Sequence, residues 1–174
     1  MVVVNSKVNG GFTLIENIIA ICLMGFLMLA FSAFLAPQAV TTADTLTQQR
    51  ASQIANLLLK EMYARPFDEV NIERLGRCDT DCTAANALQS EVGEGNLRDD
   101  FDDYDTQNQW VDIEQYALFL DGPYEGFAVN INVEYVDQDW NPVNIVTSSK
   151  HVEIQARRGD NGQVLEFHAY RSNF

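Results

Sequence analysis

The chain has 174 residues, a formal net charge of −14 and a hydrophobic content of 47%. This length allows one modest domain in addition to a membrane segment. The acidic balance argues against nucleic acid and against an anionic lipid surface as partners.

An apolar segment near the start of the chain has the length of a membrane span. No charged residue occurs from Asn17 to Ala43, and most of this run is Ile, Leu, Phe, Met, Ala and Val. About 20 apolar residues cross the hydrocarbon core of a bilayer as a helix. We therefore expect a single-pass membrane protein. Because Lys7 is the only charge before Glu16, the positive-inside tendency places the N-terminus in the cytoplasm.

A single acid, Glu16, stands at the start of this segment. A carboxylate at mid-membrane costs roughly 2.5–3.5 kcal/mol, so an acid kept inside a span usually has a partner. Thr13 and Glu16 also fit a capping box, in which both side chains bond to open amide groups of the first helical turn. Capping explains the acid, but it does not explain the Gly11–Phe12 junction in front of it.

The run from Gly10 to Asn17, followed by an unbroken apolar segment, resembles the class III signal of type IV pilins and type II secretion pseudopilins. The resemblance implies that a prepilin peptidase cuts between Gly11 and Phe12 and methylates the new amino group of Phe12. It implies that Glu16 neutralises the terminal amine of a neighbouring subunit, since opposite charges in hydrocarbon are tolerated when paired. The implied partners are other major and minor pilins, the prepilin peptidase and the inner-membrane assembly platform.

An α+β, type IV pilin-like fold is expected, with a long N-terminal helix packed on a C-terminal antiparallel sheet. The expected segments are a cleaved leader at 1–11, a transmembrane half-helix at 12–36, an amphipathic half-helix at 37–64 and a globular head at 65–174.

The amphipathic half is indicated by apolar residues at three-to-four spacing, with Ile54, Leu57 and Leu58 expected to be the most buried. Pro37 is expected to bend the helix. The helix is expected to end at Ala64, just before Arg65 and Pro66. A coiled-coil anchor is the alternative, but no strict heptad persists.

The C-terminal third is predicted to form antiparallel strands. Residues 127–135 alternate apolar and polar side chains, and residues 151–158 and 163–171 flank Asn161-Gly162, a two-residue hairpin signal. Pairing outward from that turn places Ala156 opposite Phe167. The expected domain is an antiparallel meander laid against the helix.

Cys78 and Cys82 are separated by only three residues. In an exported domain a local disulfide is the favoured interpretation, since a metal site would need two more soft ligands nearby. A disulfide that closes so short a loop stabilises the folded state by only about 2 kcal/mol, so the bond should fix a loop rather than hold the fold together. Cys22, in the apolar segment, is expected to remain a free thiol.

Five acids follow Arg98 within seven residues. Such a run is usually a solvated loop. The sharper hypothesis is a calcium site, because clustered carboxylates repel one another unless a hard cation or an arginine joins them. The candidate calcium ligands are Asp99, Asp100, Asp102, Asp103 and Asp105. Part of an EF-hand register also matches, but Asn108 occupies the slot of the required glycine. Apart from this calcium hypothesis, no cofactor is expected.

Catalytic chemistry is not indicated. His151 and His168 fall in strand patterns without a Cys, Ser or carboxylate grouping that their spacing supports. Phosphate-cradling glycine loops, nucleophile elbows and zinc spacings are missing from the sequence. We expect a protein that is not an enzyme.

Within the pilin-like group, the chain resembles the minor pilins of the mannose-sensitive haemagglutinin (MSHA) pilus. The similarity rests on residues 60–67, the acidic stretch 98–104 and residues 169–174. It implies a low-abundance subunit that helps to initiate or cap the filament. Such a subunit passes from the bacterial inner membrane, with its head in the periplasm, to a pilus at the cell surface. The tip-most pseudopilin commonly lacks the acid at Glu16, so a neighbour ahead of this subunit is expected.

Two alternatives remain open. One is a minor pseudopilin of a type II secretion system, which uses the same leader and helix. The other is an adhesin carried on a pilin anchor, for which several aromatic residues offer a binding surface. These residues are Trp110, Tyr116, Phe119, Tyr124 and Trp140.

Overall fold

The computed structural model describes residues 13–74, 76–89, 97–116, 119 and 122–173. The predicted cleavage junction at Gly11 and Phe12 lies outside these ranges. The chain divides into two compact units, Met1–Thr45 and Leu46–Phe174, and helix α1 (Leu14–Ala64) contributes residues to both.

The first unit contains the membrane-length part of α1. The 22 residues of Leu14–Leu35 form the one helix of the described chain that is long and apolar enough to cross a membrane, and none of this segment is buried by the protein. At a rise of about 1.5 Å per residue it is about 33 Å long, close to the roughly 30 Å of a hydrocarbon core. A membrane-capable N-terminal helix is therefore present, as predicted. Pro37 lies within α1 without ending it.

The second unit begins with the amphipathic end of α1. The predicted apolar stripe is confirmed at Ile54 and Leu58, which are fully buried together with Met62. The prediction for Leu57 is wrong, because its side chain is 37% exposed and Ala55 is buried in its place. Leu57 lies to one side of the stripe when successive residues turn by 100° around the helix axis. The helix ends at Ala64, as expected from the proline two residues later.

After α1, the head alternates short helices with strands. The elements are α2 (Glu69–Arg74), η1 (Asp102–Tyr104), β1 (Val111–Asp112), η2 (Ile113–Gln115), β2 (Phe127–Val136), β3 (Pro142–Val143), β4 (Ser149–Arg158) and β5 (Leu165–Ser172). In the described residues the strands form one antiparallel sheet in the order β1-β2-β4-β5, and β3 pairs with the end of β2. The α+β class and the antiparallel sheet were both predicted.

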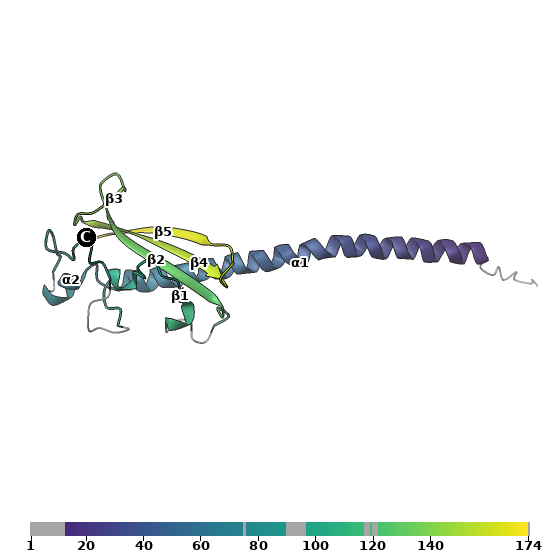
Figure 1. Cartoon of the computed structure of the whole chain (residues 1–174), viewed down its shortest axis with the longest axis horizontal. Coiled ribbons are helices and arrows are strands. Elements are labelled where there is room, and N and C mark those ends of the chain that lie inside the picture. The colour runs from purple at the N-terminus through teal and green to yellow at the C-terminus, as the bar shows by residue number, and fades with distance from the viewer. Residues whose placement is uncertain (1–12, 75, 90–96, 117–118, 120–121, 174) are drawn as a thin grey trace, which may run out of the picture. The chain divides into compact units, whose positions relative to one another are not determined.

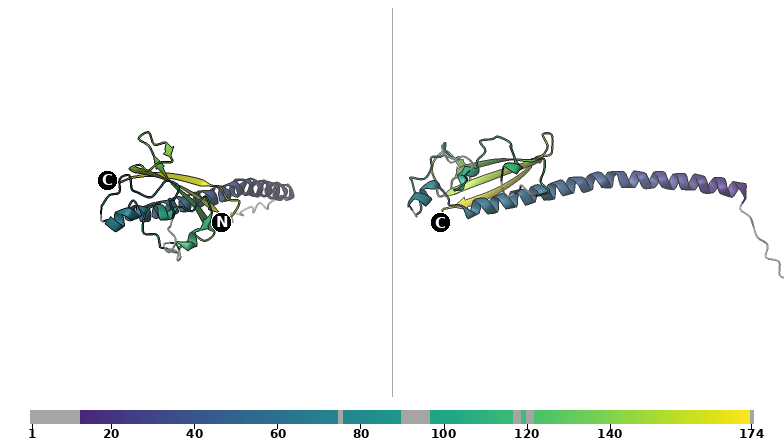
Figure 2. Two further views of the ribbon diagram at one scale, coloured as in Figure 1. Left: turned by 60° about the vertical axis from the view of Figure 1, so that its left-hand side comes forward. Right: turned by 90° about the horizontal axis from the view of Figure 1, so that it is seen from below.

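One face of the sheet packs on the C-terminal end of α1, as both sets of views show (Figures 1 and 2). Along β2, Phe127, Val129 and Ile131 are buried while the residues between them are partly exposed, which is the predicted alternation. These side chains join Ile54 and Leu58 in the main hydrophobic core. The opposite face of the sheet carries polar side chains.

The register of the β4–β5 hairpin differs from the prediction by two residues. Ala156 pairs with Leu165, and Phe167 pairs with Ile154. Gly159, at φ 67°, follows β4 and donates its N–H to the carbonyl of Gly126 at 2.8 Å. The last pair of the ladder is Ala156 with Leu165, so the connection is longer than the predicted two-residue turn. A shift of two residues leaves every side chain on its predicted face.

The buried stripe of α1 offers a matched test in two adjacent leucines. Leu58→Ala should lower the free energy of unfolding by about 2–5 kcal/mol, because it leaves a cavity in the main core. Leu57→Ala removes the same atoms from an exposed site and should cost well under half of that. Urea denaturation of the head, followed by the fluorescence of its tryptophans, measures both. Equal losses for the two variants would contradict the packing described here.

Candidate functional site

Glu16 lies in the first turn of α1 and is exposed. Its Oε2 accepts hydrogen bonds from the backbone N–H and the Oγ1 hydroxyl of Thr13, both at 3.2 Å. The N–H of Glu16 donates in return to Thr13 Oγ1 at 3.4 Å. The capping box is thus formed. Both donors are neutral, however, so the charge of the carboxylate has no opposite charge in Thr13.

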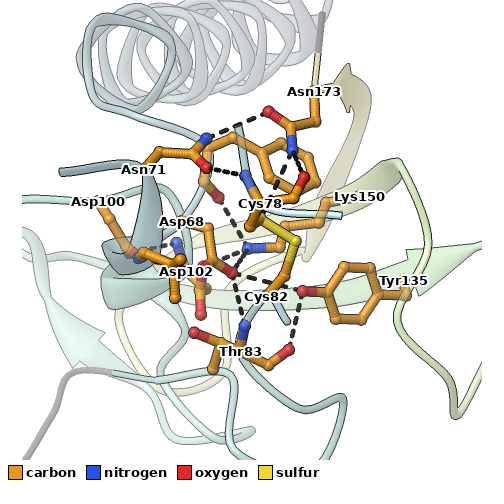
Figure 3. Close-up of polar contacts among 12 residues, drawn as sticks. Asp68, Asn71, Cys78, Cys82, Thr83, Asp100, Asp102, Tyr135, Lys150 and Asn173 are labelled. Carbon is orange, nitrogen blue, oxygen red and sulfur yellow. Dashed lines mark hydrogen bonds and ion pairs between the residues drawn. A yellow bond between two sulfur atoms is a disulfide. The ribbon is translucent and has the colours of Figure 1, made fainter. Parts of the chain in front are cut away.

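The second group of interest is a buried ammonium in the head. Lys150, on β4, is fully buried. Its Nζ donates to the carbonyl of Phe67 at 2.7 Å, to Asp68 Oδ2 at 3.2 Å and to Asp102 Oδ1 at 2.5 Å (Figure 3). The rings of Phe67 and Tyr135 flank it, with centroids 4.4 and 5.2 Å away. All three ammonium protons therefore have an acceptor inside the protein.

Asp68 accepts hydrogen bonds from several donors. It precedes α2, and its Oδ1 accepts the backbone N–H of Val70 at 3.2 Å, as a helix N-cap does. Its Oδ2 accepts the N–H of Thr83 at 2.9 Å and faces the hydroxyl of Tyr135 at 3.5 Å. Both carboxylate oxygens of Asp68 therefore have donors, and Lys150 is one of them.

The acidic run after Arg98 is folded into the head. Asp100 and Asp103 cap each other: Asp100 Oδ1 accepts the N–H of Asp103 at 3.1 Å, and Asp103 Oδ2 accepts the N–H of Asp100 at 3.1 Å. Asp99 adds its N–H to Asp103 Oδ2 at 2.7 Å. This reciprocal arrangement encloses η1 and directs Asp102 toward Lys150. The solvated-loop prediction is wrong here, since Asp100, Asp102 and Asp103 are at most 4% exposed.

Asp105 connects the same segment to the sheet. Its Oδ1 accepts the N–H of Gln107 at 2.6 Å, and its Oδ2 accepts the N–H of Val133 in β2 at 2.9 Å. Gln107 and Asn108 both have positive φ, 52° and 59°, so Asn108 does occupy a position that favours glycine. A 3₁₀ helix and a short strand flank this turn, which is not the helix–loop–helix of an EF-hand.

Four carboxylates of the run have a hydrogen-bond donor other than a metal on at least one oxygen. Calcium takes six to eight oxygen ligands, whereas backbone amides and Lys150 already bond to oxygens of Asp100, Asp102, Asp103 and Asp105. Within the described residues, the one compact group of ligand atoms is Asp68, Cys78 and Cys82, and both sulfurs there are in a disulfide. The calcium site stays a prediction, and this geometry favours a structural role for the run.

Burial changes the acidity of the run. Burial, together with the charges of Asp102 and Asp103, raises the pKa of Asp100 to about 9. Burial also raises the pKa of Asp102, against the opposing effect of Lys150, and raises that of Asp105. The segment therefore holds fewer negative charges at neutral pH than its composition suggests.

The predicted disulfide between Cys78 and Cys82 is present. Both residues are buried in a second hydrophobic cluster beside Tyr135. Asn71 Oδ1 accepts the N–H of Cys78 at 2.6 Å, and Asn173 Nδ2 donates to the Cys78 carbonyl at 2.9 Å (Figure 3). The loop is thus bound to α2 and to the C-terminal end of the chain. Cys22 is an exposed free thiol.

The two histidines lie on the polar face of the sheet. His151 Nδ1 is 2.9 Å from Glu134 Oε1, and His151 Nε2 is 3.1 Å from His168 Nδ1. The ring of Tyr170 stacks on His151 with centroids 4.8 Å apart. The sequence placed both histidines in strands, but it did not indicate that they meet.

Of the aromatic residues considered as a binding surface, Tyr116 and Phe119 belong to the core. Arg157 covers Trp110, with its guanidinium carbon 4.1 Å from the ring centroid. Trp140 is 52% exposed and packs edge-on against Tyr170. Its φ of 64° is unusual for a bulky residue and is held by the turn that begins at Asp137.

Lys150 is the functional group that sequence reasoning missed. The alternation of side chains along β4 indicates that Lys150 is buried, because it lies on the same face as Val152 and Ile154. A lysine on a buried face needs a carboxylate partner. Which of the 25 acidic residues supplies it is not visible in the sequence.

The chain matches no protein-family model, no curated protein and no solved structure. Its function must therefore be argued from its own residues and their geometry.

The raised pKa of Asp100 predicts how the stability of the head depends on pH. An unfolded aspartate ionises near pH ~3.9, whereas folded Asp100 keeps its proton up to a pKa of about 9. Between these values the folded state binds more protons, so the free energy of unfolding falls as pH rises. Asp100→Asn keeps the shape without the ionisation and should flatten this decline, as measured by urea midpoints across that pH range.

Asp139→Asn provides the control for this experiment, because Asp139 is an exposed aspartate of the same domain. Its pH profile should run parallel to that of the unsubstituted protein. An Asp100→Asn profile as steep as that of the unsubstituted protein would show that Asp100 ionises normally in the fold.

Proposed function

We propose that this protein is a minor pilin of an MSHA-type type IV pilus, resembling the minor pilin MshD. A prepilin peptidase cleaves it between Gly11 and Phe12 and methylates Phe12. The N-terminal half of α1 then holds it in the bacterial inner membrane, with its head in the periplasm. From there the assembly platform moves it into a filament at the cell surface, where it helps to initiate or cap the pilus.

The observation that carries this proposal is the position of Glu16. It is an exposed acid in the first turn of a membrane-length helix, it follows the Gly11–Phe12 junction, and Leu14–Leu35 has no other charge. Thr13 supplies hydrogen bonds but no positive charge. The terminal amine that cleavage creates on a neighbouring subunit supplies that charge, and pairing the two lowers the cost of both in hydrocarbon.

The head is compatible with this role. An antiparallel sheet packs on the amphipathic end of the helix that also provides the membrane-length segment. The Cys78–Cys82 disulfide suits an oxidising compartment such as the periplasm.

Processing is tested at adjacent glycines. Gly11→Ala should abolish cleavage, because the residue before the cut changes, while Gly10→Ala should leave cleavage intact. Intact mass and N-terminal sequencing of the protein from bacterial membranes measure the outcome. A start other than methylated Phe12 in the unsubstituted protein would overturn the assignment of the leader.

Assembly is tested by separating the charge of Glu16 from its capping. Glu16→Val should be cleaved normally but should be at least several-fold depleted from sheared filaments. Thr13→Ala breaks the capping box and keeps the charge, so it should assemble nearly as well as the unsubstituted protein. Asp44→Val removes an acid from the same helix outside Leu14–Leu35 and serves as the control. Equal depletion of the Thr13 and Glu16 variants would favour a purely local role for Glu16.

The same fractionation separates the pilin from a minor pseudopilin of a type II secretion system. A pilin is recovered with sheared surface filaments, whereas a pseudopilin remains with the cell envelope.

A pilin-anchored adhesin is the second candidate, and exposed Trp140 is the observation that favours it. In a glycan-binding screen of the detergent-solubilised chain, Trp140→Ala should then lose any specific signal. Trp110→Ala should retain it, because Arg157 already covers that ring.

A further inference from the structure

The surroundings of Lys150 are those of a reaction centre as well as of an ion pair. Its Nζ lies 2.5 Å from Asp102 Oδ1 and 3.2 Å from Asp68 Oδ2. The side chains of Lys150, Asp68 and Asp102 are at most 1% exposed. Water is thus kept from an amine and a carboxyl group that the fold holds in contact. Such fixed proximity corresponds to effective concentrations of about 10⁵–10⁸ M in favourable intramolecular reactions.

The two carboxyl groups are not equivalent. Asp68 accepts hydrogen bonds from backbone N–H groups on both oxygens, and these bonds hold its carboxylate beside Lys150. Asp102 Oδ1 bonds to Lys150, while its Oδ2 is buried without a hydrogen-bond partner in the described residues. Burial raises the pKa of Asp102, which favours the uncharged acid. Asp102 is therefore suited to be the electrophile and Asp68 to be the base.

We propose that Lys150 and Asp102 condense into an intramolecular isopeptide bond, with Asp68 as the catalytic base. Lys150 first passes a proton to Asp102, which gives a neutral amine and a neutral acid. The amine attacks Cγ of Asp102, and Asp68 takes a proton from the nitrogen. Asp68 returns that proton to the departing hydroxyl, so the Nζ–Cγ bond forms, a Cγ–O bond breaks and one water leaves. The reaction needs no other reactant.

The buried setting favours the product. An ion pair in a low-dielectric interior carries a desolvation penalty for each ion, and condensation replaces these two charges by a neutral amide. The new N–H can still donate to Asp68, whose other donors, from Val70, Thr83 and Tyr135, are unchanged. The bond would join β4 to η1 across 48 residues, independently of the disulfide and of the proposed function.

Intact mass spectrometry of the purified full chain in detergent, after reduction, tests the proposal. The measured mass should fall below the mass of the same polypeptide by one water molecule. Proteolysis should release a branched peptide that joins the Lys150 segment to the Asp102 segment. A full mass, or a branch to Asp68 in place of Asp102, would overturn the proposal.

Three variants identify the roles. Lys150→Arg keeps the positive charge but lacks the primary amine, so the mass should no longer fall by one water. A loss of water that persists in this variant reflects another dehydration, such as succinimide formation, and overturns the proposal. Asp68→Asn removes the base and should leave the full mass. Asp102→Asn should lose ammonia instead of water, since the leaving group changes; a persisting water loss would exclude Asp102 as the electrophile. Far-UV circular dichroism and a cooperative urea transition report that each variant is folded.

Discussion

The head is organised around one buried positive charge. An ammonium group without water costs several kcal/mol unless acceptors surround it, and Lys150 obtains three acceptors from two separate segments. Phe67 and Asp68 lie just after α1, and Asp102 lies in the acidic run. The chain can therefore pack its sheet on the helix only if the segment after α1 and the acidic run both return to the same end of β4.

The acidic run follows from that requirement. Mutual capping of Asp100 and Asp103 shapes η1 so that Asp102 faces Lys150, and Asp105 attaches the next residues to β2. One ammonium cannot compensate so many carboxylates. Protonation removes part of the excess negative charge, and the raised pKa of Asp100 is the clearest case. Composition alone overstates the charge of this region.

Features of the fold that depend on neighbours in sequence were predictable, and features that depend on distant partners were not. Alternation along β2, the end of α1 ahead of Pro66 and the Cys78–Cys82 bond are local, and each was read correctly from the sequence. The hairpin register was missed because Gly159 bonds to Gly126, a contact between distant residues. The acidic run was read as exposed because its cation lies 48 residues from Asp102. A dense run of charges along the chain therefore indicates an exposed segment only where no counter-charge from a distant segment joins it.

Two charges in apolar surroundings are thus resolved in opposite ways. Lys150 is neutralised by carboxylates of its own chain, Asp68 and Asp102. Glu16 has only neutral donors in Thr13, and no lysine, arginine or histidine occurs between Lys7 and Arg50. Under the proposed function, the cation that pairs with Glu16 is the terminal amine of a neighbouring subunit. The N-terminal helix, rather than the head, is then the element that we propose drives association with another subunit.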